Sequence, residues 1–214
     1  MTSYASDGST SVPGDEAADA IDERRRAVLE VAVRLVAEEG PHALSLRRVA
    51  TEAGGSTQLV YTLFGGKSGL ADAIYAEGFA RLAEAGRQAL DAAPPPGDPE
   101  RIVAIGRAYL EFARVEPGFF AVMFGRAIPG FVPARATRGT CRATTFGRLV
   151  AEVQQCLEAG TLVAADAHDL ARLCWVTVHG LAALDAAGML APDDPDAFAE
   201  QVLRTPLVAH RPSG

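Results

Sequence analysis

Residues 46–70 read LRRVATEAGGSTQLVYTLFGGKSGL, and this stretch decides the fold that the sequence predicts. Ser45 precedes a first short helix and can cap it, because a serine hydroxyl can accept a hydrogen bond from a free backbone N–H of the first turn. Gly54 and Gly55 end that helix, and Ser56 can cap a second helix over about 57–63. Two short helices joined by a glycine-containing turn form a helix-turn-helix, whose second helix can enter the major groove of DNA.

The second helix has an apolar face and a polar face. Val60, Leu63 and Phe64 can point inward, whereas Gln58 and Tyr61 are candidates for contact with base edges. Glutamine can hydrogen-bond adenine through two atoms, and a threonine methyl group can contact the methyl group of thymine. The side chains that we expect at the DNA surface are Ser45, Arg47, Arg48, Ser56, Thr57, Gln58, Tyr61, Thr62 and Lys67.

Residues 24–75 resemble the DNA-binding domain of TetR-type (tetracycline-repressor-like) transcriptional regulators. That pattern has a glycine after the first helix, a Ser or Thr cap, Ala-x-x-Ala-Gly-Val-Ser, an aromatic-rich recognition helix and a lysine that opens a fourth helix. The matching positions are Gly40, Ser45, 50–56, Tyr61, Phe64 and Lys67. The resemblance implies a homodimer that binds a palindromic operator in double-stranded DNA, and a helical domain that binds a small effector.

Charge and two departures from the pattern keep a second interpretation open. The net charge is −7, and residues 21–67 carry seven Lys or Arg against six Asp or Glu. Gly55 stands where the family usually has an apolar residue, and Leu63 stands where His or Tyr is frequent. The leading interpretation is a ligand-responsive repressor. The alternative is a helical module that binds a protein or a small molecule and has lost DNA binding.

Helical periodicity and Gly/Pro breaks predict an all-α protein of about nine helices, at about 22–39, 46–53, 57–63, 67–90, 99–115, 119–124, 134–159, 166–188 and 196–205. We expect a disordered tail at 1–20, a DNA-binding domain at 21–66, a ligand-binding and dimerisation domain at 67–206, and a short tail at 207–214. The chain has no apolar run long enough to span a bilayer and no signal-peptide core, which indicates a cytoplasmic protein without a membrane partner.

A second resemblance lies near the C-terminus. Residues 175–180 read WVTVHG, similar to the Trp-x-x-x-His-Gly segment in the ligand domain of one TetR-family subgroup. Aromatic residues and a methionine gather in this half of the chain and suit an apolar cavity. The expected effector is therefore small, largely apolar and uncharged. The expected pocket residues are Tyr109, Phe112, Phe119, Phe120, Met123, Phe124, Phe146, Trp175 and His179.

The last two long helices are the expected dimer interface. In TetR-like proteins they pair with those of a second subunit, and here they carry apolar residues after which no later core element follows. The interface candidates are Leu181, Leu184, Phe198 and Val202.

No catalytic or metal-binding motif is found in the sequence. The four histidines, at 42, 168, 179 and 210, include no pair at a metal-ligand spacing, and there is no G-x-S-x-G or phosphate-binding glycine loop. The three cysteines are widely spaced, which predicts free buried thiols. We therefore expect no enzyme activity, no metal and no cofactor.

Overall fold

The computed structural model describes residues 13–40, 44–125, 128–191 and 193–212. Within these ranges every regular element is a helix, so the predicted all-α class is confirmed. The helices are α1 (Pro13–Glu39), α2 (Leu46–Glu52), α3 (Thr57–Phe64), α4 (Lys67–Asp91), α5 (Glu100–Val115), α6 (Pro117–Phe124), α7 (Arg135–Thr144), α8 (Phe146–Glu158), α9 (Ala167–Ala186) and α10 (Pro195–Val208).

The segment that we predicted as one helix over 134–159 is two helices, which explains the count of ten in the described residues. The break lies at Thr145, between α7 and α8. The hydroxyl groups of Thr144 and Thr145 donate to the carbonyl oxygen of Cys141, at 3.1 and 2.8 Å. Such side-chain bonds compete with the helical backbone ladder, and β-branched residues tolerate a helix interior less well than alanine does.

Helix α1 begins at Pro13, so residues 13–20 of the expected disordered tail belong to it. Proline is accepted at the start of a helix, and residues 17–20 read AADA, which includes three residues of the best helix former. Residues 1–12 of that predicted tail lie outside the described part of the chain.

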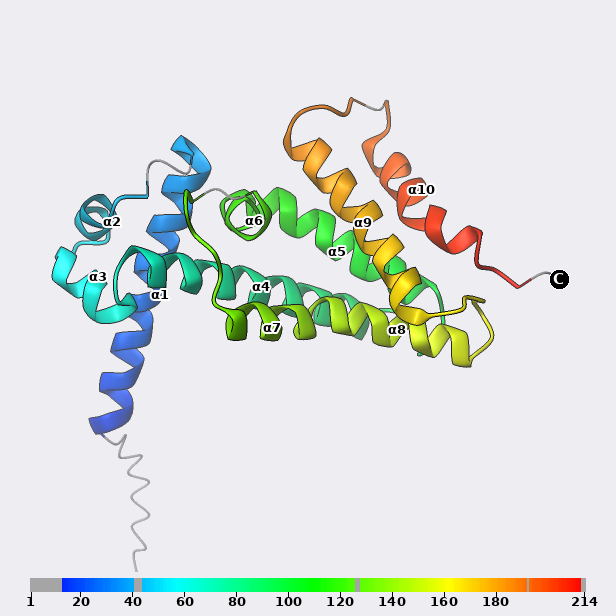
Figure 1. The fold of residues 1–214 in the computed structure, drawn as a ribbon, viewed down its shortest axis with the longest axis horizontal. Helices are drawn as coiled ribbons and strands as arrows, with labels where there is room; N and C mark the ends of the chain where they lie inside the picture. Colours follow the sequence, from blue (N-terminus) through cyan, green and yellow to red (C-terminus); the bar gives the residue numbers. More distant parts are fainter. Residues whose placement is uncertain (1–12, 41–43, 126–127, 192, 213–214) are drawn as a thin grey trace, which may run out of the picture.

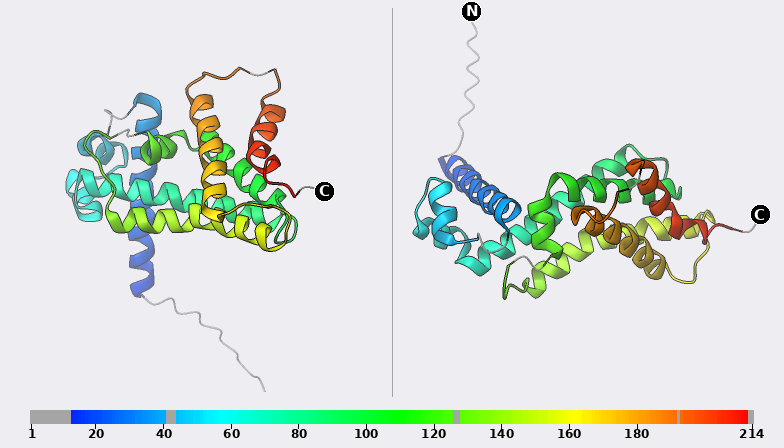
Figure 2. Two further views of the ribbon diagram at one scale, coloured as in Figure 1. Left: turned by 45° about the vertical axis from the view of Figure 1, so that its right-hand side comes forward. Right: turned by 90° about the horizontal axis from the view of Figure 1, so that it is seen from above.

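Helix α4 is the long element around which the others are arranged (Figure 1). Helices α1–α3 gather at its N-terminal end, α5 and α6 pack on one side of it, and α7 packs along another. Helices α9 and α10 form an outer pair against α5 and α8, as the two further views in Figure 2 also show. This arrangement separates a small N-terminal helix-turn-helix region from a larger C-terminal helical domain.

The small and large parts share one continuous core. Buried residues run from Val28 and Leu35 in α1 through Leu70 and Ile74 in α4 to Phe119 in α6. Helix α6 also touches α1 directly, because a Cβ at Gly118 would stand only 2.5 Å from the carbonyl oxygen of Val33. Among the described residues, no helix is both long enough and apolar enough to cross a membrane.

Candidate DNA-binding surface and ligand cavity

The turn between α2 and α3 has the geometry that its glycines and serine predict. Gly54 has φ +68°, a left-handed conformation that favours glycine, and the Gly55 N–H donates to the Ala50 carbonyl oxygen at 2.8 Å. Ser56 is the N-cap of α3, and its Oγ accepts a hydrogen bond from the Leu59 N–H at 3.2 Å. These bonds fix the start of the second helix relative to the first.

Ser45 occupies the expected N-cap position of α2 but does not act as a capping side chain. Its backbone is extended, and its hydroxyl makes no capping hydrogen bond. The residue is exposed, so the hydroxyl lies at the surface just before α2. The structure therefore corrects the predicted cap, and leaves the Ser45 hydroxyl in a position to meet a phosphate.

Helix α3 presents the polar face that its periodicity predicts. Val60 and Phe64 are buried, whereas Gln58 and Thr62 are exposed and Tyr61 is 51% exposed. The Thr62 hydroxyl donates to the Gln58 carbonyl oxygen at 3.0 Å. Thr57 is half-buried at the start of the same helix. The candidate base-reading side chains thus share one exposed surface of a short, well-anchored helix.

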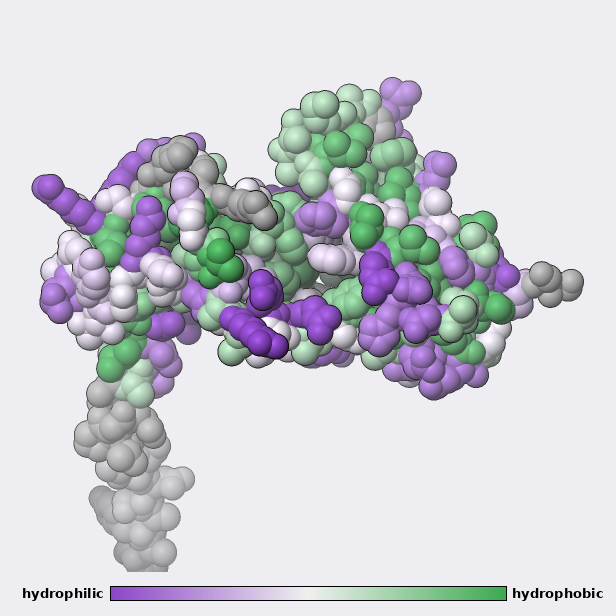
Figure 3. Space-filling view, in the orientation of Figure 1, coloured by the Kyte–Doolittle hydropathy of each residue, from purple (hydrophilic) through white to green (hydrophobic). Residues whose placement is uncertain are grey.

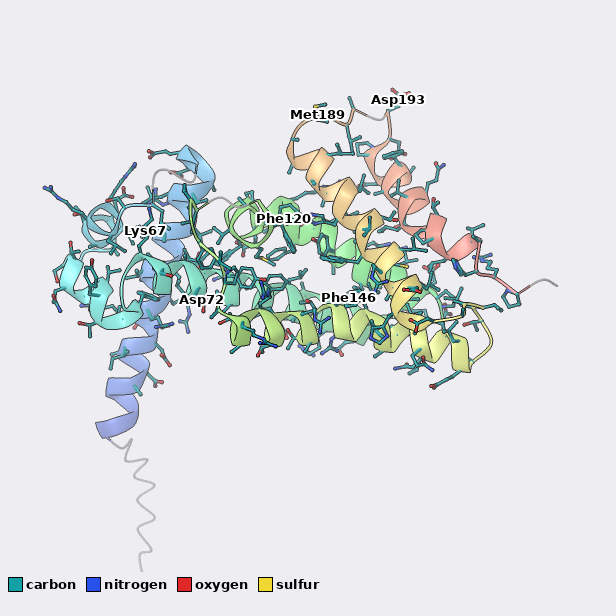
Figure 4. The ribbon with its side chains drawn as sticks, in the orientation of Figure 1. Lys67, Asp72, Phe120, Phe146, Met189 and Asp193 are labelled. Atoms are coloured by element: carbon teal, nitrogen blue, oxygen red, sulfur yellow. The ribbon has the colours of Figure 1, made fainter. Side chains whose placement is uncertain are left out.

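The ring of Tyr61 packs against the turn that precedes α4. A Cβ at Gly66 would lie 3.2 Å from Cε1 of Tyr61, and Gly66 has φ +113°, a conformation that favours glycine. Gly66 is the N-cap of α4, and the exposed Lys67 follows it as the first helical residue. Figure 4 shows Lys67 at the end of the molecule that α1–α3 form. A cation beside free N–H groups at a helix start suits a phosphate partner.

The two arginines of α2 have different surroundings. Arg48 is bound to Glu39 of α1, and its Nε lies 2.9 Å from a carboxylate oxygen of Glu52. Glu52 also binds Arg34, at 2.6 Å. Arg47 is exposed, and no ion pair is found for it within the described residues. Of the two, Arg47 is therefore the one whose charge faces solvent uncompensated.

Arg25 of α1 belongs to the basic cluster at 24–26, for which the sequence leaves a solvated surface and contact with the DNA backbone equally open, and its contact with α3 was not predicted. Its Nη1 donates to the Leu63 carbonyl oxygen at 2.5 Å, and its guanidinium lies 4.5 Å from the centre of the Phe64 ring. Both partners belong to the last turn of α3. Arg25 thereby supports the C-terminal end of the candidate recognition helix, and the cluster of three arginines at 24–26 was the signal that could have indicated it.

The C-terminal domain contains a cavity of about 560 Å³ that is lined by residues of helices α4 to α10. Five of the nine expected pocket residues line it: Tyr109, Met123, Phe124, Phe146 and Trp175. Figure 4 shows Phe146 on the inner side of α8, in the space below α5 and α9. Lining by aromatic side chains and methionine is typical of sites for apolar ligands.

The other four expected pocket residues do not line the cavity. Phe119 is fully buried beneath Arg81, whose guanidinium lies 4.4 Å from its ring centre. Phe112 lies on the opposite side of α5, beside a shallow groove. Phe120 and His179 stand behind the aromatic wall, with 5.7 Å between their ring centres. Phe112 and Phe119 are thus core residues, while Phe120 and His179 support the wall.

Burial disfavours the charged form of His179. Its Nδ1 lies 2.8 Å from the Tyr109 hydroxyl, and burial lowers the pKa of His179 while it raises the pKa of Tyr109. In the tautomer with its proton on Nε2, Nδ1 accepts the hydrogen bond of that hydroxyl. The pair fixes the orientation of Tyr109, which lines the cavity.

Nucleophilic or metal chemistry finds no support in this site. The three cysteines are free and buried, and burial raises the pKa of the cavity-lining Cys174 thiol to about 12. In the described part of the chain, no group of three or more His, Cys, Asp or Glu side chains could hold a metal ion. The observed lining suits the binding and orientation of a ligand.

The remaining part of the cavity wall was not predicted from the sequence. Tyr75 and Phe79 contribute from α4, a helix in which no pocket residue was predicted. Arginines line it as well: Arg138 and Arg142 from α7, Arg148 from α8 and Arg172 from α9. The signal was present, because residues 117–151 contain five arginines and no Asp or Glu.

The expected dimer residues lie on or near the outer surface of α9 and α10. Leu184 is 47% exposed and Phe198 is 36% exposed, whereas Leu181 and Val202 are half-buried. Leu173 and Val176 of α9 are exposed as well, so this helix presents an apolar surface to solvent. The pale and dark green residues over α9 in Figure 3 belong to this part of the molecule.

Comparison with known proteins assigns both parts of the chain. The family model of bacterial regulatory proteins of the tetR family matches residues 28–74, and that of the tetracyclin repressor-like C-terminal domain matches residues 102–205. No match was found among curated proteins.

Solved structures share the fold over nearly the whole chain. A protein of unknown function from Rhodococcus sp. RHA1 is 28% identical, with a TM-score of 0.76 over 88% of this chain and 95% of that one. A TetR-family protein from Vibrio parahaemolyticus is 24% identical, with a TM-score of 0.68 over 89% and 100% of the two chains. The TetR-family regulator PfmR from Thermus thermophilus is 22% identical, with a TM-score of 0.66 over 85% and 97%.

The two family models together match well over half of the sequence, and they match it in the order that the structure shows. The N-terminal match contains α2 and α3 with their glycine turn, and the C-terminal match contains the cavity walls from α5 to α9. These matches do not assign the chain to the subgroup with the Trp-x-x-x-His-Gly segment. The chain belongs to the TetR family of bacterial transcriptional regulators, a class of DNA-binding proteins that are not enzymes.

Proposed function

We propose that this protein is a ligand-responsive repressor, which binds a palindromic operator as a homodimer and is released from it by a small, largely apolar effector. The exposed surface of α3 is the observation that carries the proposal. Gln58 and Tyr61 stand there on a helix whose start is capped by Ser56 and whose end is bound by Arg25. A helix presented in this way can enter the major groove. A regulator of this kind acts on DNA in the cytoplasm.

The functional division that we propose is residues 21–66 for DNA binding and residues 67–206 for ligand binding and dimerisation, with 1–20 and 207–214 as tails. The apolar surface on α9, which includes the exposed Val176 and Leu184, supports the dimer. A twofold dimer would place two copies of α3 on successive turns of one face of DNA, which is why the operator is palindromic.

Helix α6 supports a mechanism that couples the cavity to DNA binding. Met123 of α6 lines the cavity, and its Sδ would lie only 2.6 Å from a Cβ at Gly78 of α4. At its other end α6 touches α1 through Gly118. A ligand that moves α6 would therefore move α1 and α4 together. The effector binds better to a form in which the two α3 helices have the wrong spacing, and operator DNA must weaken effector binding by the same factor.

One observation keeps the second function in view. Arg34 and Arg48 are engaged by carboxylates of α1 and α2, so the helix-turn-helix region offers few free cations to phosphates. A module of the same fold that has lost DNA binding would show no retardation of any duplex. That result would contradict the repressor function and favour a module that binds a small molecule or a protein.

Two variants of the DNA surface test the proposal on duplexes selected from a random pool. Gln58→Ala is expected to lose discrimination at one base pair in each half-site, by about 1–3 kcal/mol, with little change in binding to unrelated DNA. Lys67→Ala is expected to weaken binding to all DNA sequences alike. It should also reduce the slope of log affinity against log salt concentration by about one. If both variants footprint as the wild type does, α3 and Lys67 do not have these roles.

The two neighbouring arginines of α2 provide a matched control in the same assay. Arg47→Ala should reduce the salt slope by about one, because an uncompensated surface cation is removed. Arg48→Ala should change the slope less, because Glu39 and Glu52 already neutralise that guanidinium. Equal slopes for the two variants would show that the ion pairs of Arg48 open when DNA binds.

A further inference from the structure

The cavity of the C-terminal domain lies beside the most basic segment of an acidic chain. Residues 117–151 contain five arginines and no Asp or Glu, whereas the whole chain has a net charge of −7. Three of these arginines line the cavity: Arg138, Arg142 and Arg148. Figure 3 shows a group of strongly hydrophilic residues over α7, the helix that carries the first two.

The positions of Arg138 and Arg142 are set by the way in which α7 is fixed to α4. Asp72 of α4 accepts hydrogen bonds from the Ala134 N–H at 2.9 Å and from the Thr137 hydroxyl at 2.7 Å. These bonds anchor the first turn of α7. Arg138 and Arg142 are four residues apart and so lie on the same side of the helix, which is the side towards the cavity.

Two acidic residues of α4 beside this part of the wall already have other partners. Asp72 is used by the two α7 donors, and Glu84 is bound by Arg87 at 2.7 Å. Within the described residues no ion pair is found for Arg138, Arg142 or Arg148. The fourth arginine of the wall, Arg172, is different, because Asp169 lies 2.5 Å from it.

Most of the remaining wall is apolar. Phe79 and Leu82 from α4, Ile102 and Ile105 from α5 and Val178 from α9 line it. The three unpaired arginines are exposed and line the cavity, so they stand where it meets solvent. The site therefore has an apolar interior and a cationic edge. Guanidinium groups bind carboxylates and other oxyanions through paired, charge-assisted hydrogen bonds.

We propose that the effector is an amphipathic anion: an apolar body in the aromatic cavity, with a carboxylate or similar oxyanion held at its edge by Arg138, Arg142 and Arg148. This inference rests on the proposed function, in which the cavity is the effector site. It replaces the expectation of an uncharged effector. The same arginines should weaken the binding of hydrophobic cations.

Trp175 provides the measurement, because it lines the cavity and is the only tryptophan of the chain. The probes are dodecanoate, dodecanol and dodecyltrimethylammonium, which share an apolar chain and differ in charge. Dodecanoate should change Trp175 fluorescence and raise the thermal midpoint at the lowest concentration, dodecanol should need a higher one, and the cation should bind weakest. Equal or tighter binding of dodecanol, or no binding by any of the three, would overturn the inference.

Substitutions then test whether these three arginines bind the carboxylate. A chain with Arg138→Gln, Arg142→Gln and Arg148→Gln should bind dodecanoate at least about ten-fold more weakly, the change that about 1.4 kcal/mol produces, and bind dodecanol as before. Arg135→Gln is the matched control, because Arg135 lies on the same helix but does not line the cavity. Circular dichroism and thermal melting establish that each variant is folded.

The outcomes separate this inference from the function on which it rests. If dodecanoate binds through the three arginines but leaves operator affinity unchanged, the ligand class stands and the coupling to DNA fails. If the triple variant binds dodecanoate as the wild type does, the inference is wrong whatever happens at the operator. If that variant instead loses operator affinity alone, the arginines serve nucleic acid and the inference is again overturned.

Discussion

The side chain of Leu59 occupies the space that a side chain at Gly55 would need: its Cδ2 lies 2.8 Å from the position of a Cβ at Gly55. The two residues belong to the turn and the second helix of the helix-turn-helix. The family pattern usually has an apolar residue at position 55, and here the leucine of the next turn covers that place. Packing in the turn is thus kept, although the residue that normally provides it is absent.

Alanine at the two adjacent glycines should change stability in opposite directions. Gly55→Ala is expected to raise the free energy of unfolding by about 0.4–1 kcal/mol, because it restricts the unfolded chain and only the flexible end of Leu59 has to move. Gly54→Ala is expected to lower it by about 1–2 kcal/mol, because Gly54 has φ +68°. Urea unfolding measures both. Destabilisation by Gly55→Ala would mean that Leu59 cannot move.

Arg25→Met should loosen the end of the recognition helix. The variant loses the hydrogen bond to the Leu63 carbonyl oxygen and the contact with the Phe64 ring, which together contribute about 1–2 kcal/mol to the free energy of unfolding. Operator affinity should fall with it, because α3 is held less firmly. Arg26→Met is the control, since Arg26 is exposed and has no hydrogen bond within the described residues. Equal effects of the two variants would show that net charge alone matters.

Local signals in the sequence were sufficient for the DNA-binding region. The turn at Gly54, the cap at Ser56 and the alternation of buried Val60 with exposed Tyr61 all depend on residues within a few positions of one another. Such signals can be read without knowledge of the tertiary structure. The contact of Arg25 with α3 was not predicted because its partner Leu63 is far away in the sequence.

The ligand cavity depends on contacts that the sequence does not reveal. Phe112, Phe119 and Phe124 are equally apolar, and only the packing of α5 and α6 decides that Phe124 faces the cavity while the other two do not. The arginines of α7 face it because Thr137 is bound by the distant Asp72. A pocket predicted mainly from the aromatic residues therefore included part of the apolar wall and none of the arginines at its edge.

A charge on the exposed surface of α9 should prevent dimerisation. Val176→Glu combined with Leu184→Glu places two carboxylates on residues that are 60% and 47% exposed in the single chain. In an interface each would be a buried unpaired charge, with a cost of about 3–5 kcal/mol. Sedimentation should show a folded monomer with lost operator binding. The control is Val115→Glu on α5, at a residue that is 64% exposed, and this variant should remain a dimer. If the variant with both Val176→Glu and Leu184→Glu also remains a dimer, the interface lies elsewhere.

Stability should fall on acidification because of His179. Burial lowers the pKa of His179 below its ordinary 6.5, so the unfolded chain binds more protons than the folded one between these two values. The free energy of unfolding should therefore decrease as the pH falls through 6.5, and this contribution should level off below the folded-state pKa. Urea unfolding between about pH 8 and about pH 5 measures it. His179→Gln should show a smaller decrease, whereas the exposed His168→Gln should behave as the wild type does.

Arg81 joins the three helices through which the proposed coupling acts. On α4, it binds Glu30 of α1, Glu77 of its own helix at 2.9 Å and Glu116 at the start of α6 at 2.8 Å. Its guanidinium also covers Phe119 of α6. A side chain that bridges several helices in this way can stabilise one arrangement of those helices over another. Substitutions of such side chains alter the coupling free energy between two binding sites by about 0.5–2 kcal/mol.

Arg81→Met should therefore reduce the coupling between effector binding and operator binding more than it reduces the affinity for either one. The measured quantity is the ratio of dodecanoate affinities with and without saturating operator, which should move towards one in the variant because α1 and α6 are no longer joined through α4. Arg87→Met is the matched control, since Arg87 lies on the same helix and, among the residues that the structure describes, its ion pairs are with Glu84 and Asp91 of that helix. A ratio unchanged by Arg81→Met, with both affinities intact, would show that the signal passes through the packing of Gly78 and Gly118 alone.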